Sequence, residues 1–103
     1  MKIIQEISEM IEDELSGAKH YIEKANHLKE TNPSLARVFY EISLQEMNHV
    51  NLLHGEVVKL IEQHRREKGE PPAAMLAVYD FLHEKHIGKA NKIKIYQAQY
   101  RGD

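Results

Sequence analysis

The chain has 103 residues, which is enough for one domain with a modest core. Its 14 lysines and arginines nearly balance its 16 acidic residues, so a net charge near −2 offers no basic surface to nucleic acid. The absence of cysteine excludes disulfides, thiolate catalysis and cysteine-ligated zinc.

Two further classes are not expected. No apolar run approaches the roughly 20 residues that a membrane span needs. The first six residues turn acidic too early for a signal peptide. We therefore expect one cytoplasmic domain over residues 1–103 that binds neither nucleic acid nor membrane.

Prolines divide the chain into three long stretches, each of which is predicted to be a helix. The first covers about residues 2–30. Asn32 and Pro33 have the residue types of an N-cap and a first helical position, and they predict a second helix over about 33–67. Gly69, followed by two prolines, indicates a helix end and a third helix over about 73–99. The predicted fold is all-α: an antiparallel hairpin with a third helix that folds back on the second.

A seven-residue apolar stripe on the first predicted helix indicates a bundle core. Its members are Ile4, Ile7, Ile11, Glu14, Ala18, Tyr21, Ala25 and Leu28. Glu14 interrupts this stripe near its middle. A buried carboxylate is costly unless a cation or hydrogen bonds compensate it.

The second predicted helix carries an equivalent stripe with two polar interruptions. Its members are Leu35, Phe39, Ile42, Glu46, His49, Leu53, Glu56 and Leu60. Glu46 and His49 share a helix face because they are three residues apart. In an antiparallel hairpin turning near Asn32, Glu14 lies at their height to within about one helical turn. The three side chains are therefore predicted to converge as metal ligands.

One chain supplies half of a known ligand set. Ferritin-like four-helix bundles hold two metal ions with a Glu from each of two helices and a Glu-x-x-His from each of the other two. A single hairpin here carries one Glu and one Glu-x-x-His. We therefore expect a homodimer, the commonest way to double such a motif, whose two hairpins complete a four-helix bundle.

The residues that carry this prediction also resemble a family. The segment from Glu14 to Tyr21 resembles the first-helix segment of rubrerythrin-type ferritin-like proteins, and Glu46-Met47-Asn48-His49 matches their second-helix motif. The resemblance covers about residues 7–60. It implies iron ligation by Glu14, Glu46 and His49, with Glu46 bridging and Tyr21 donating a hydrogen bond behind the ligands. Half-length members that dimerise, such as encapsulated ferritins, are the most similar in architecture.

Two departures from that family shape the expected activity. Without cysteine there is no rubredoxin centre, and residues 96–103 contain no recognisable encapsulin-targeting tail. We expect Fe(II) oxidation for iron storage or detoxification, with Glu14, Glu46 and His49 as the catalytic ligands. The alternatives are peroxide reduction, which needs an external electron donor, and a non-catalytic helical dimer that acts as an interaction module. Manganese or zinc would suit the same ligands.

Other polar groups are assigned to different places. Asp80 and His83 form a second acid-x-x-His pair, but on a third helix folded back near residue 70 they would lie beside residues 57–60, far from Glu46. Ala90, Asn91 and Ile93 would face the centre instead. The remaining histidines form no evident cluster in the sequence and are expected on surfaces or in core contacts: His20, His27, His54, His64 and His86. The role of the third helix, and any assembly beyond a dimer, stay open.

Overall fold

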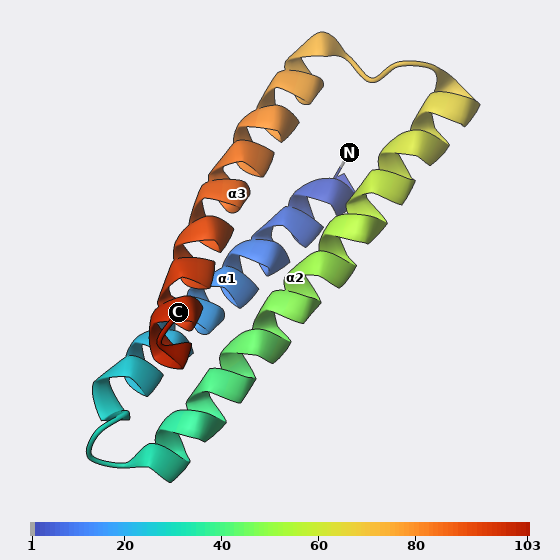
Figure 1. Cartoon of the computed structure of the whole chain (residues 1–103). Coiled ribbons are helices and arrows are strands. Elements are labelled where there is room, and N and C mark those ends of the chain that lie inside the picture. Colours follow the sequence, from blue (N-terminus) through green and yellow to red (C-terminus); the bar gives the residue numbers. More distant parts are fainter. Residues whose placement is uncertain (1) are drawn as a thin grey trace.

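The computed structural model describes residues 2–103 as three long helices. They are α1 (Lys2–Leu28), α2 (Pro33–Lys68) and α3 (Ala73–Arg101). α1 and α2 form an antiparallel hairpin, and α3 returns beside α1 in a molecule of 56 × 20 × 17 Å (Figure 1). The predicted all-α fold is confirmed, and the helix limits agree with the predictions to within two residues. Within the described residues, no helix is long and apolar enough to cross a membrane.

The two turns form where the sequence predicts them. The Asn32 side chain accepts a hydrogen bond from the backbone N–H of Leu35 at 3.3 Å, and Pro33 occupies the first helical turn. Gly69 ends α2 with a φ of 82°, a conformation that favours glycine. Its N–H donates to the carbonyl of Arg65 at 3.1 Å. Local sequence therefore fixes both reversals of the chain.

The predicted core stripe on α1 is wrong by one residue at alternate positions. Ile4, Ile11, Ala18 and Ala25 are buried as predicted, but the buried positions between them are Ser8, Leu15 and Ile22. The residues predicted there are only half-buried: Ile7, Glu14, Tyr21 and Leu28. The core therefore turns toward α3, which the pattern of a hairpin alone did not include.

The predicted stripe on α2 is displaced in the same way. Its buried residues are Ala36, Tyr40, Ser43, Met47, Val50 and Val57, each one position from a predicted member. The predicted members are half-buried or exposed. On both helices these half-buried side chains follow the edge of the core on the side away from α3, and we call this surface the open face. It comprises Ile7, Glu14, Tyr21 and Leu28 of α1 with Leu35, Phe39, Ile42, Glu46, His49, Leu53 and Leu60 of α2.

The prediction that the third helix folds back on the second is also wrong, because α3 packs chiefly on α1 (Figure 1). Polar contacts explain its position. The Asn26 side chain donates to the Tyr96 carbonyl at 3.0 Å, and Lys29 donates to the Gln99 carbonyl at 3.2 Å. Ile93 is 1% exposed and joins the core formed by α1 and α2, whereas Asn91 is exposed.

One buried polar chain links all three helices. The Ser43 hydroxyl of α2 donates to the Ala18 carbonyl of α1 at 2.8 Å, and it accepts from Gln97 Nε2 of α3 at 3.1 Å. Ser43 and Gln97 are both buried. Because buried polar groups need partners, this chain fixes the axial position of α3 on the hairpin.

Candidate metal centre

The structure brings together the three residues that the sequence predicts as ligands. Glu14 of α1 and Glu46 and His49 of α2 each offer one ligand atom, and these atoms lie within 4.8 Å of one another. Among the residues described, no other group of three or more His, Asp or Glu side chains has its ligand atoms so arranged. The hairpin register inferred from Asn32 therefore places both helices at the same height.

The centre lies on the open face and is partly accessible. His49 Nδ1 lies 3.3 Å from Glu14 Oε2. The His49 side chain is 50% exposed and that of Glu14 is 28% exposed. One side of the group therefore rests on the hairpin core, and the other side faces outward.

The two carboxyl groups are electrostatically coupled. Their mutual hydrogen bond holds the pKa of Glu14 below its ordinary value, and the neighbouring His49 acts in the same direction. The same hydrogen bond raises the pKa of Glu46, and partial burial adds to this rise. The pair therefore favours one shared proton over two full negative charges, as expected for adjacent carboxyls without a cation.

A glycine makes room for the Glu46 carboxylate. A Cβ atom built on Gly17 would lie 3.1 Å from Glu46 Oε2, which is tighter than an ordinary contact. Gly17 lies three residues after Glu14, so the two positions share one face of α1. The absence of a side chain at Gly17 allows the carboxylate of α2 to approach α1 closely.

Tyr21 lies one heptad after Glu14 on the same face. It is half-buried, and its ring packs against Phe39 with the centroids 5.7 Å apart. No hydrogen bond joins its hydroxyl to Glu14, Glu46 or His49 in the described structure. In this arrangement Tyr21 acts as a packing residue beside the centre, and its expected donor role stays a prediction.

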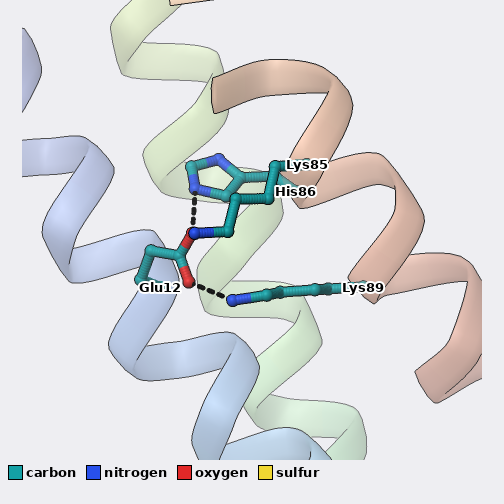
Figure 2. A network of polar contacts seen from close by, with 4 residues as sticks. All are labelled: Glu12, Lys85, His86 and Lys89. Carbon is teal, nitrogen blue, oxygen red and sulfur yellow. Dashed lines mark hydrogen bonds and ion pairs between the residues drawn. The ribbon is translucent and has the colours of Figure 1, made fainter. Parts of the chain in front are cut away.

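A second polar group holds α3 against α1 (Figure 2). Glu12 Oε1 lies 3.1 Å from His86 Nε2 and 3.7 Å from Lys85 Nζ, and Lys89 donates to Glu12 Oε2. Burial alone would raise the pKa of Glu12, but Lys89, His86 and Lys85 together hold it below its ordinary value. The sequence analysis missed this network, although three basic residues spaced three or four apart on α3 indicated a common acidic partner.

Asp80 and His83 lie away from the Glu14 centre, as the sequence predicts. Asp80 faces a hollow that Val58 and Glu62 also line. His83 stacks on His54 of α2 with the ring centroids 4.6 Å apart. The expectation that the remaining histidines form no cluster is wrong, because His54, His83 and His86 line one hollow.

The residues at the Glu14 centre fit a metal ion. Two carboxylates and an imidazole are ligands for iron, manganese and zinc, and the coupled carboxyl pair lacks the positive charge that would stabilise both ionised forms. Glu14, Glu46 and His49 leave coordination positions toward the outer side of the open face. Comparisons of the chain with family models, with curated proteins and with solved structures gave no match.

Proposed function

We propose that two copies of this chain pack their open faces together and form a ferritin-like four-helix bundle that binds and oxidises Fe(II). Each copy would contribute Glu14, Glu46 and His49, giving four carboxylates and two imidazoles around a pair of iron ions. The observation that carries the proposal is the convergence of these three ligand atoms within 4.8 Å on an uncovered face.

The composition of the open face supports a second copy as the occupant. Apolar side chains surround the centre along both helices, and several remain accessible, including Ile3 at 48%, Met10 at 53% and Leu35 at 37%. A second hairpin would bury them and remove their cost in water. A twofold axis at the centre would also place like residues opposite one another, which is how a self-complementary interface forms.

The chain's own residues would bind and orient the metal. Glu46, between Glu14 and the Gly17 space, is positioned to bridge two ions, and His49 is positioned as a terminal ligand. The proton that the carboxyl pair shares must leave as the cations bind, so binding should release protons and weaken at acidic pH. When bound, iron supplies the electrons that reduce O₂.

Anaerobic Fe(II) titration of the metal-free protein, followed by air, tests the proposal. We expect two iron ions per dimer and rapid appearance of ferric absorbance in the near ultraviolet. Glu46→Gln should abolish the oxidation, whereas Glu56→Gln, an exposed carboxylate on the same helix, should leave it intact. Absence of iron uptake by the unaltered protein would refute the metal function.

A separate pair of variants tests the dimer. Met10→Lys places a charge on the open face and should shift sedimentation toward the monomer and reduce iron uptake. Phe81→Lys alters an equally accessible apolar residue on the outer side of α3 and should change neither property. A Met10→Lys protein that remains dimeric and oxidises iron normally would place the interface elsewhere.

Two alternatives predict different results in the same assays. Peroxide reduction predicts that H₂O₂ oxidises the bound iron much faster than O₂ does, and that turnover needs an added electron donor. A non-catalytic interaction module predicts a dimer that forms without metal and tolerates Glu46→Gln with His49→Ala. The metal-bound hypothesis also allows manganese or zinc as the ion, which competition titrations would distinguish.

A further inference from the structure

Three histidines of α2 and α3 line one hollow on the side of the molecule away from the Glu14 centre. The hollow has a volume of about 190 Å³, and His54, His83 and His86 form part of its wall. Asn51 and His49 are two residues apart on α2, so they point in nearly opposite directions. Because Asn51 lines the hollow, His49 faces away from it.

The imidazoles are close and available. His83 and His86 share a face of α3 because they are three residues apart. The His54 ring stacks on His83 with an interplanar angle of 15°, and neither ring makes a hydrogen bond to another described residue. Burial holds the pKa of His54 and of His86 below the ordinary value, so near neutral pH their rings carry a free lone pair.

His86 is supported from behind by a carboxylate. Its Nε2 atom lies 3.1 Å from Glu12 Oε1, yet both atoms are buried without a properly aligned hydrogen bond. The other ring nitrogen of His86 points away from Glu12 (Figure 2). A carboxylate behind one nitrogen, with the other nitrogen free, is the arrangement that metal-binding histidines commonly have.

We propose that His54, His83 and His86 form a second metal site, which binds a divalent ion such as zinc or cobalt between α2 and α3. Three imidazoles with an open fourth position suit these ions, whereas magnesium and calcium prefer oxygen ligands. Glu12 acts as a positioning residue that orients the His86 ring. The site does not depend on the function proposed for Glu14.

The surroundings allow the ligands to reorganise. The stacked rings of His54 and His83 must turn apart for their nitrogens to converge, and both side chains are only half-buried, so rotation about their side-chain bonds is open to them. The neighbouring cations do not prevent binding. Lys85 and Lys89 are paired with Glu12, and Lys94 is exposed at the rim of the hollow. The ion would tie together two helices that otherwise touch little.

The test uses the full chain with Glu46→Gln and His49→Ala, which removes the first centre. Titration with Co(II), followed by visible absorption and competition with Zn(II), should give one ion per chain. Adding His83→Ala or His54→Ala should weaken binding at least about tenfold. Adding His20→Ala, an exposed histidine of α1, should leave it unchanged.

A gain-of-signal variant guards against simple misfolding. His83→Cys in the same background should retain the ion and add a thiolate-to-cobalt charge-transfer band, because thiolate is a good ligand for cobalt and zinc. Glu12→Gln should weaken binding by about 10- to 100-fold without abolishing it. Absence of Co(II) binding in the background protein, or equal binding by the His83→Ala protein and its parent, would overturn the proposal.

Discussion

Glu12 and Glu14 lie two residues apart on α1 and serve opposite sides of the molecule. Successive residues of a helix are rotated by about 100°, so their side chains point nearly 200° apart. Glu12 contacts Lys85, His86 and Lys89 of α3. Glu14 contacts His49 of α2 on the open face. One turn of helix thus separates the attachment of α3 from the candidate metal centre.

Neutralising each carboxylate should therefore have a distinct effect. Glu12→Gln should lower the free energy of unfolding by about 1–3 kcal/mol, because it leaves His86 and two lysines without their counter-charge. It should leave iron binding at the first centre intact. Glu14→Gln should abolish iron binding and change stability little in the metal-free protein. Urea denaturation and iron titration of both variants measure the two effects, and loss of iron binding by Glu12→Gln would contradict the separation.

Gly17→Ala should separate helix stability from metal binding. Alanine favours the helix over glycine by about 1 kcal/mol, so the metal-free variant should be more stable. The added Cβ would displace the Glu46 carboxylate, from which it would otherwise be 3.1 Å, and should weaken metal affinity.

Gly55→Ala is the matched control, since nothing lies within 4 Å of a Cβ built there. It should bring the same helix stabilisation with unchanged metal affinity. Thermal unfolding with and without metal distinguishes the two glycines. Equal metal affinity for both variants would show that the carboxylate adapts freely.

Ser43→Ala should test the buried polar chain. The change removes the acceptor of Gln97 Nε2 and leaves that amide buried without its partner. We expect the free energy of unfolding to fall by about 1–3 kcal/mol. Ser16→Ala, at an exposed position of α1, should have little effect. Chemical denaturation of both proteins decides between them, and equal stability would mean that water replaces the lost contact.

The sequence was sufficient for the hairpin and the convergence of the Glu14 centre. Asn32, Pro33 and Gly69 punctuate the chain locally, so helix limits do not depend on distant contacts. Helix rise alone then sets the relative heights of Glu14 and Glu46. These inferences use only short-range chemistry and regular geometry.

The position of α3 required the structure. Apolar residues are spread around α3, with Val78, Phe81 and Ile95 exposed while Ile93 is buried, so its pattern does not specify one packing face. Its orientation depends on long-range contacts such as Gln97 with Ser43. For the same reason the cluster of His54 with His83 and His86 was invisible, because it exists only once α2 and α3 are placed together.

Acidification should destabilise the metal-free protein through those histidines. Burial lowers the folded-state pKa of His54 and of His86, and the positive charge of the stacked His83 lowers that of His54 further. The unfolded chain therefore binds more protons, so the free energy of unfolding falls as pH drops through the ordinary histidine pKa near 6.5. The fall should level off below the folded-state pKa values. Glu12 partly offsets the effect at His86, where Lys85 and Lys89 also lie close.

Urea denaturation between pH 8 and pH 5, in the presence of a chelator, measures this dependence. His54→Gln removes one of the two histidines and should flatten the curve, whereas His20→Gln, at an exposed position, should leave it unchanged. Saturating zinc should steepen the loss of stability on acidification if the three histidines bind it, because protons then compete with the ion for the same nitrogens. A stability that rises toward pH 5 would contradict the buried, neutral state assigned to His54 and His86.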